Sequence, residues 1–511
     1  METPEQDRPT ASLRLGFALG GAAALPARPP FRLLVIGDFG GSGAALSLRG
    51  EVPANLPEQL GVELDIEIAN LLGSAPARLG FRLPIRRFGD FSAKALMANI
   101  EPLRRAGALR ARIAAGSTDP EGFDDLDALL AAIGAAQPAA PLPSGQSDAD
   151  LLLSILGDAE PAEPASGLGS IIGAITQPAR RRLPVKEAIA TIDRIIAAQL
   201  AEIRAEPRFA AVEAAWRGLQ LLLRRPPYGE DIEIDLLDVP ADSAAACLLR
   251  DIVPDELEQE SRPGLGAVLV LGTTATMVEG VERLVYCAVA GAALQVPVIA
   301  SLPQGCFDAE TAEDKAAWEL LRGQEGAEWL TACHGDLVLD VEERAPPLWG
   351  EPGWAVAALA LASATRTGWP CELADASVTT LEGLELHEIA GRGVPAAWPL
   401  RAPIGSAGMA ALRQRGVASL GAQANRDRVF LAAAPTVGDE TGLGDRLLIA
   451  ALRAQLRGLG SAEAIQAVLG ALLPDAAELT LDARPESGFA IALRPGLRGL
   501  GGRRIAFDHP G

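Results

Sequence analysis

Short apolar segments alternate with helical patterns between residues 185 and 341, and this alternation constrains the fold more than any other feature of the sequence. Four segments have the length and apolarity of buried strands: DIEIDLLDV (231–239), LGAVLVLG (265–272), VPVIAS (296–301) and DLVLDV (336–341). Helical patterns precede and separate them, beginning with VKEAIATIDRIIAAQLAEI (185–203) and FAAVEAAWRGLQLLL (209–223). A chain that alternates strands with helices buries the strands in a sheet that helices cover, so the pattern predicts an α/β fold.

The N-terminal part predicts a second β-rich region. A buried strand at Leu33–Ile36 leads into the glycine cluster Gly37–Gly43, and residues 63–68 alternate acidic and apolar side chains, which predicts a strand with one exposed face. Another β-rich stretch is expected at 81–88. A helix is expected over 91–113, because its apolar residues recur at helical spacing.

Composition divides the chain into five segments. Residues 116–182 are rich in Ala, Pro, Gly, Ser and Asp, which is typical of a linker, and we expect this linker to join two folded halves. The expected segments are a flexible arm (1–27), a first domain (28–115), the linker (116–182), a second domain (183–400) and a C-terminal region (401–511). The linker is expected to hold short helical pieces near 126–133 and 151–156, and the C-terminal region an amphipathic helix at 443–456.

The charge balance limits the partners. The chain has 511 residues and a formal net charge of −21, so its surface repels nucleic acid and anionic membranes, although a small basic patch can still exist locally. Five cysteines without CxxC spacing indicate neither a disulfide framework nor a zinc site and favour a reducing cytoplasm. No secretory signal is visible at the N-terminus, and residues 284–302 are expected to form a buried helix that leads into a strand instead of a membrane span.

The glycine cluster is the strongest candidate for a cofactor site, and the residues argue against it. No Lys-Ser or Lys-Thr follows it, as a phosphate-binding P-loop needs, and the bulky Leu46 stands where a dinucleotide fingerprint needs its third glycine. A left-handed turn that leaves a buried strand is the favoured interpretation. The three histidines lie far apart, and Cys306 is expected to be an inert buried thiol, so we expect no metal, no cofactor and no catalytic site.

Apolar side chains at two places predict packing or assembly surfaces. An apolar stripe at helical spacing is formed by Val185, Ile189, Ile192, Ile196, Leu200 and Ile203. The large ring of Trp216 follows in the next helical pattern. The terminal segments ELTLDARP (478–485) and GFAIALRP (488–495) predict edge strands that carry Leu479, Leu481, Phe489 and Ile491. Burial within one protomer and contact between protomers are equally compatible with both patterns.

Several stretches resemble the sheath proteins of type VI secretion systems. PFRLLVIGDFGG (30–41) and FGDFSAKALMANIEPLRRAGALRARI (88–113) resemble the small sheath subunit. IDRIIAAQLAEIRAEPRFAAVEAAWRGLQLLL (192–223), GWAVAALALASATRTGWPCELADASVTTLEGLELHEI (353–389), LRQRGVASLGAQANRDRVFLAAAPTV (412–437) and PESGFAIALRP (485–495) resemble the large one. The matches follow the family order, and both subunits occur in one polypeptide. The linker stands where the family's strand-exchange segments and the helix bound by its disassembly ATPase would be.

The resemblance implies a sheath-type α/β (α+β) fold with mixed sheets flanked by helices, and a cytoplasmic, bacterial, non-enzymatic protein. The implied partners are copies of the chain itself in a helical homo-oligomer, an inner-tube protein, baseplate or other sheath components, and a disassembly ATPase. Two alternatives stay open. One is a sheath-derived adaptor or cap at the end of a sheath, and the other is a nucleotide-binding enzyme that uses the Gly37–Gly43 loop.

Overall fold

The computed structural model forms two compact units. Unit 1 comprises residues 1–64, 84–88 and 207–511, and unit 2 comprises residues 65–83 and 89–206. The residues that the structure describes are 30–41, 43–49, 53–72, 76–115, 185–224, 231–258, 263–274, 276–308, 310–341, 347–374, 377, 379–389, 395–439, 442–456, 462–472, 489–492 and 504–507. The short helical pieces expected near 126–133 and 151–156 lie outside them.

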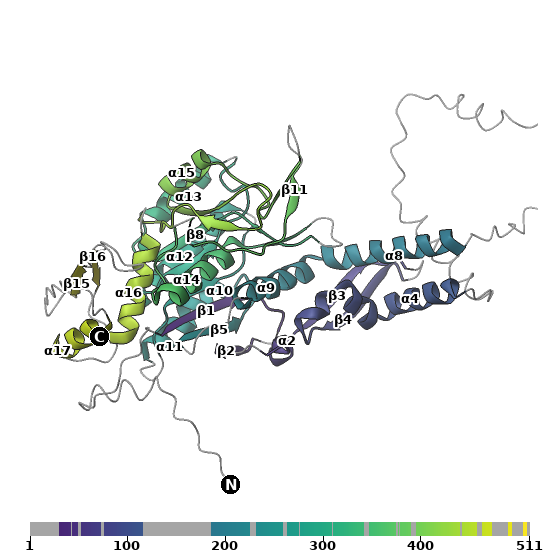
Figure 1. Ribbon diagram of the computed structural model, residues 1–511, viewed down its shortest axis with the longest axis horizontal. Coiled ribbons are helices and arrows are strands. Elements are labelled where there is room, and N and C mark those ends of the chain that lie inside the picture. Colours follow the sequence, from purple (N-terminus) through teal and green to yellow (C-terminus); the bar gives the residue numbers. More distant parts are fainter. Residues whose placement is uncertain are drawn as a thin grey trace, which may run out of the picture. The chain divides into compact units, whose positions relative to one another are not determined.

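Unit 1 is built around a sheet of eight strands in the order β14-β13-β8-β7-β6-β1-β5-β2 (Figure 1). Its strands are β1 (Phe31–Gly37), β2 (Ala45–Arg49), β5 (Ile232–Asp238), β6 (Ala267–Val270), β7 (Val298–Ser301), β8 (Leu330–His334), β13 (Val417–Ala422) and β14 (Val429–Leu431). The six inner strands pair in parallel, whereas the edge strands β2 and β14 pair antiparallel to their neighbours. The mixed sheet confirms the expected fold class.

Strand β1 lies between two strands from far along the chain. It pairs with β5 from Phe31 opposite Ile232 to Gly37 opposite Asp238, and with β6 from Leu33 opposite Ala267. Both partners lie beyond residue 182, and between them they satisfy the backbone hydrogen-bonding groups on the two edges of β1. The sequence suggests two folded halves joined by a linker, whereas the structure unites strands of both halves in one sheet.

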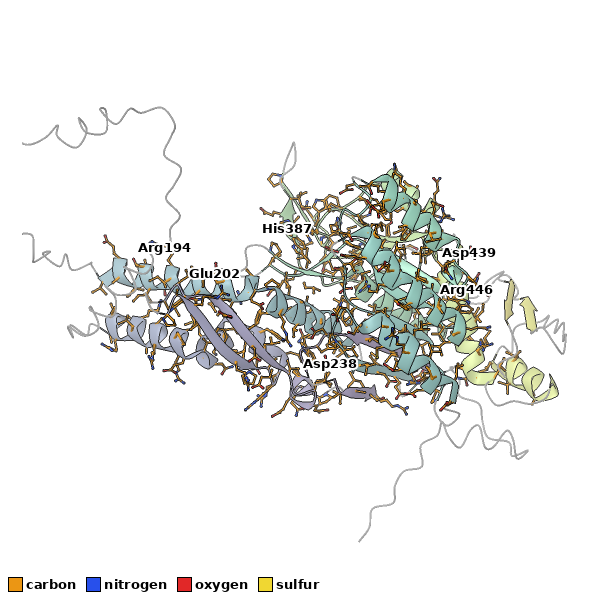
Figure 2. The ribbon with its side chains drawn as sticks, turned by 180° about the vertical axis from the view of Figure 1, so that it is seen from behind. Arg194, Glu202, Asp238, His387, Asp439 and Arg446 are labelled. Carbon is orange, nitrogen blue, oxygen red and sulfur yellow. The ribbon has the colours of Figure 1, made fainter. Side chains whose placement is uncertain are left out.

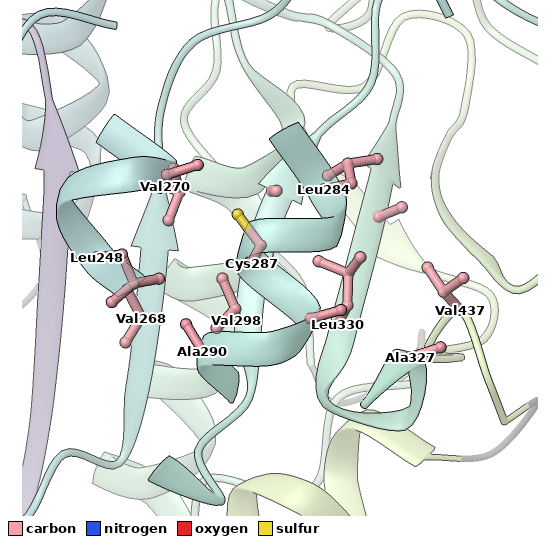
Figure 3. Packing of buried hydrophobic residues seen from close by; sticks show 14 of the residues in the cluster. Leu248, Val268, Val270, Leu284, Cys287, Ala290, Val298, Ala327, Leu330 and Val437 are labelled. Atoms are coloured by element: carbon pink, nitrogen blue, oxygen red, sulfur yellow. The ribbon is translucent and has the colours of Figure 1, made fainter. Parts of the chain in front are cut away.

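One face of the sheet is covered by helices around α12 (Met277–Leu294). The other elements on this side are α10 (Ala244–Cys247), η2 (Leu248–Ile252), α11 (Val253–Glu258) and α13 (Ala312–Arg322). Figure 3 shows Leu284, Cys287 and Ala290 of α12 packed with Val268 and Val298 of the sheet. Helix α12 begins where the Thr276 hydroxyl accepts the Glu279 N–H and ends at the left-handed Gln295. Together with β7 it confirms the helix and strand expected at 284–302.

Helix α14 (Pro352–Thr367) packs on the other face of the sheet, opposite to the face that α12 covers. A Cβ added to Gly353 would lie 2.7 Å from the Leu269 Cδ1 atom, so the helix backbone touches the sheet. Helix α9 (Pro207–Leu223) packs beside α14, and a Cβ on Gly218 would lie 2.2 Å from the Trp354 Nε1 atom. Glycine at both positions therefore sets the distance between neighbouring elements.

The remaining elements of unit 1 are short helices and small sheets. The helices are α2 (Leu56–Gln59), η3 (Ala327–Trp329), α15 (Ser406–Gln414), α16 (Gly442–Leu456) and α17 (Ala462–Leu472). Three antiparallel pairs are β9 (Leu337–Asp340) with β10 (Leu348–Gly350), β11 (His387–Ile389) with β12 (Ala396–Trp398), and β15 (Phe489–Ala492) with β16 (Arg504–Phe507). The predicted strand at 336–341 thus exists, but it pairs with β10, while β8 continues the parallel sheet.

In the part of unit 2 that the structure describes, a strand pair is combined with a 3-10 turn and three α-helices. This part contains β3 (Glu63–Ala69) and β4 (Arg78–Pro84), η1 (Phe88–Phe91), α3 (Ala93–Asn99), α4 (Glu101–Ala114) and α8 (Val185–Ala205). In β3 the apolar side chains are buried and the acidic ones exposed, as the alternation predicts. Strand β4 overlaps the expected range of 81–88 only at 81–84, because it begins at Arg78 and ends at Pro84. The helix expected over 91–113 is divided at Ile100, which is extended, because Pro102 offers no N–H to continue the hydrogen-bond ladder.

Candidate functional site

The glycine loop after β1 is held by a carboxylate from the end of β5. The Asp238 Oδ1 atom accepts the Phe39 N–H at 2.8 Å and its Oδ2 atom accepts the Gly43 N–H at 3.1 Å, while the Gly40 N–H donates to Asp38 at 2.9 Å. Asp238, labelled in Figure 2, is 3% exposed. Backbone N–H groups of this kind bind phosphate in nucleotide sites, and in this loop they bind the protein's own carboxylates.

The loop is also closed by packing. The Trp216 Nε1–H donates to the Phe39 carbonyl at 2.9 Å, and the two buried rings meet edge to face with their centroids 5.3 Å apart. A Cβ on Gly41 would lie 2.5 Å from the Leu60 carbonyl oxygen, so the loop has no room for a side chain at this position. Gly40 and Gly43 have φ angles of 76° and 82°, which confirms the left-handed turn expected from the sequence.

A buried cation joins β1 to the second part of the sequence. The Arg32 Nε atom lies 2.5 Å from Asp235 of β5, and its Nη1 atom lies 2.7 Å from Glu256 of α11. All three residues are buried. In this arrangement two carboxylates compensate one guanidinium. The ion pairs therefore link the segment before residue 116 to the segment after residue 182.

A second buried cation lies at the carboxyl ends of β6 and β7. Arg283 donates to the carbonyls of Leu271 and Ser301, both at 3.3 Å, and the Glu351 carboxylate accepts the Gly272 N–H at 2.7 Å. Burial raises the pKa of Glu351, and the Arg283 charge acts in the opposite direction. These groups cap the ends of strands and the start of α14, which is a structural role.

The thiols of Cys306 and Cys287 are poor nucleophiles. Burial raises the pKa of Cys306 to about 12 and that of Cys287 to about 11, so both thiols are protonated near neutral pH. Burial lowers the pKa of His334. Within the described residues, no group of three or more His, Cys, Asp or Glu side chains could hold a metal ion.

The predicted apolar stripe lies on α8, which packs against α4. Ile192, Ile196, Leu200 and Ile203 are buried, Ile189 is half-buried and Val185 is 48% exposed. The stripe is also broader than predicted, because Ile195 and Gln199 are buried as well. The Gln199 amide bridges to the strand pair, donating to the Ala69 carbonyl at 2.9 Å and accepting the Leu71 N–H at 2.7 Å. A polar residue at this point carries no hydrophobic signal, so the sequence pattern misses it.

The other predicted assembly residues are distributed between the glycine loop and the C-terminal strands. Trp216 is fully buried against the loop. Phe489 and Ile491 lie on β15 opposite Phe507 and Ile505 of β16, a partner strand that the sequence interpretation missed. Leu479 and Leu481 lie outside the described residues. Whether any of these residues contacts another protomer stays a prediction.

One protein-family model matches a segment of the chain. Residues 186–329, from α8 to η3, match the VipB family, described as EvpB/VC_A0108, tail sheath N-terminal domain. No curated protein matches. Among solved structures, one similar chain belongs to the cryo-EM structure of the anti-feeding prophage baseplate, 6-fold symmetrised: it is 13% identical, with 55% of this chain and 71% of that chain covered and a TM-score of 0.33. The family match supports a sheath-type structural protein.

None of the helices in the described part of the chain combines the length and apolarity that a membrane span requires.

Proposed function

We propose that this chain is a structural protomer of a type VI secretion sheath in which the small and large subunits are fused. The family match on residues 186–329 supports the large-subunit part. The observation that carries the fusion is the position of β1. The strand with the small-subunit-like sequence pairs on one side with β5 and on the other with β6, and both of these strands lie inside the matched segment.

A shared sheet explains why fusion is compatible with the fold. If two separate chains formed such a sheet, β1 would be an inter-chain strand, and assembly would depend on the concentration of both chains. In the fused chain the partner strands are already tethered, and Arg32 of β1 forms buried ion pairs with Asp235 of β5 and Glu256 of α11. One polypeptide therefore supplies a complete sheath-type sheet.

The proposed action is mechanical and non-enzymatic. Copies of the chain associate in a helical array around an inner tube in the bacterial cytoplasm, and baseplate components and a disassembly ATPase act on that array. The occupied N–H groups of the glycine loop argue against the nucleotide alternative, because a phosphate would have to displace the buried Asp238 carboxylate. The protonated thiols argue against nucleophilic catalysis.

Negative-stain electron microscopy of the purified full chain, alone and with the inner-tube protein, tests the proposal. We expect tubes or partial helical arrays whose amount rises with protein concentration. Particles that decorate only the ends of sheaths would favour the cap alternative. Monomers under every condition would contradict a sheath role.

A further inference from the structure

Unit 2 carries a basic surface on α4 that contrasts with the acidic chain. Residues 89–115 of unit 2 contain five basic and two acidic side chains, whereas the whole chain has a net charge of −21. On α4, Arg104, Arg105 and Arg112 are exposed and lie within about 100° of one another around the helix, on the side away from the buried Leu103 and Ala106. Arg104 and Arg105 have side chains that are 64% and 79% exposed, and both contact Glu101, which leaves the face positive. We call these three arginines the basic face.

Unit 1 exposes a surface of the opposite sign on the helices that cover one side of its sheet. Of the four large hydrophobic side chains that are most exposed in the described residues, three lie on these helices: Leu257 (58%) on α11, Tyr286 (41%) on α12 and Leu320 (70%) on α13. Helix α12 packs against both α11 and α13. The exposed carboxylates on and beside these helices are Asp242, Asp251, Asp255, Glu258, Glu279, Glu282, Glu313 and Glu319, against the exposed cations Arg250 and Lys315. We call this surface the acidic face.

The composition of the acidic face indicates the kind of partner that fits it. Glu279, Glu282 and Tyr286 follow one another at helical spacing on α12, so acidic and apolar groups form one exposed stripe. Concentrated like charge is unfavourable until cations approach it, and exposed side chains such as Leu320 gain from contact with aliphatic surface. Arginine supplies both the cation and the aliphatic surface. Its guanidinium pairs with carboxylates or lies on an aromatic ring, and its methylene stem packs on apolar groups.

We propose that the basic face of one copy docks on the acidic face of the next copy. The charges are complementary, and a second copy is the partner that brings a basic helix to the acidic face at equal stoichiometry. Because the two faces are different surfaces of the same chain, the contact is heterologous and propagates from copy to copy, as an open helical array requires. The identity of the partner as a second copy rests on the proposed sheath function, and the inference adds which surfaces meet.

Charge reversal on each face tests the contact. The basic-face variant combines Arg104→Glu, Arg105→Glu and Arg112→Glu, and the acidic-face variant combines Glu258→Arg, Glu282→Arg and Glu319→Arg. A matched control reverses three exposed arginines elsewhere: Arg208→Glu, Arg413→Glu and Arg426→Glu. Self-association is measured by sedimentation velocity at low and high salt, and circular dichroism checks that each variant folds.

We expect each face variant to associate at least tenfold more weakly than the wild type and to lose most of its salt dependence, while the control associates normally. An equimolar mixture of the two face variants is expected to restore association, because the reversed basic face of one then meets the reversed acidic face of the other. This rescue separates a broken contact from a misfolded variant.

Different failures have different meanings. If the wild type assembles and both face variants assemble equally well, the contact is wrong and the sheath proposal stands. If the mixture does not restore association, the two faces do not meet. If the basic-face variant loses only binding to DNA or to anionic vesicles, the basic face serves another partner. A wild-type chain that never associates overturns both proposals.

Discussion

Replacing Asp238 by alanine tests the account of the glycine loop most sharply. The carboxylate is buried and accepts the N–H groups of Phe39 and Gly43. Phe39 is fully buried, so its N–H has no solvent to replace the lost acceptor, and an unsatisfied buried donor of a charged hydrogen bond costs about 2–3 kcal/mol. Gly43 is exposed, so water can bind its N–H and the loss there is about 0.5 kcal/mol. Asp238→Ala should therefore lower the free energy of unfolding by about 3 kcal/mol.

Urea unfolding followed by tryptophan fluorescence measures this change, because Trp216 packs on the same loop. Asp238→Asn keeps the shape and one acceptor oxygen, so it should lose less than Asp238→Ala. Glu388→Ala, an exposed carboxylate on β11, serves as the matched control and should unfold like the wild type. An Asp238→Ala variant within about 0.5 kcal/mol of the wild type would refute the reasoning, since the loop would then not depend on the carboxylate.

Three further changes probe other parts of the structure. Gly218→Ala should lower the free energy of unfolding by about 1–3 kcal/mol, because its Cβ would meet the Trp354 ring; an unchanged urea midpoint would contradict the close packing of α9 on α14. Arg32→Met should cost about 3–5 kcal/mol, because it removes the buried guanidinium that pairs with Asp235 and Glu256; a neutral result would contradict the ion-pair account. Since burial raises the pKa of Cys306 to about 12, iodoacetamide at pH 8 should leave it unmodified in the native chain and alkylate it in urea, and rapid native labelling would show that it is reactive.

The strands and helices with strong local patterns could be predicted from the sequence. The alternation in β3 and the stripe of α8 each have a period that only one kind of element satisfies, and the short apolar run of β1 is marked as a strand by its length and the glycines that follow it. Short strands without such a period were missed. Strand β8 carries the polar residues Thr331 and His334 inside a buried sheet, and β2 is an edge strand with mostly exposed side chains.

The partners of β1 could not be predicted, because pairing across about two hundred residues has no local signal. The same limit applies to Asp238, which in the sequence is one acidic residue at the end of an apolar strand. The residues that the loop lacks argue against a nucleotide site from the sequence alone. The carboxylate bound to the loop N–H groups could not be predicted in the same way, because it depends on the register that places Gly37 opposite Asp238.

The net charge of the whole chain does not reveal that one of its segments is basic. A net charge of −21 predicts an acidic surface, yet residues 76–115 are strongly basic. Charge counted along the chain locates this segment, but only the helical arrangement puts Arg104, Arg105 and Arg112 on one exposed face.

A helical reconstruction by cryo-electron microscopy of arrays formed by the full chain tests the central claim most directly. The account predicts a repeating unit that is filled by one 53.0 kDa chain, with β1 seated between β5 and β6 of that unit. A repeating unit that needs a separate small subunit, or a purified chain that forms no array at any concentration, would contradict it.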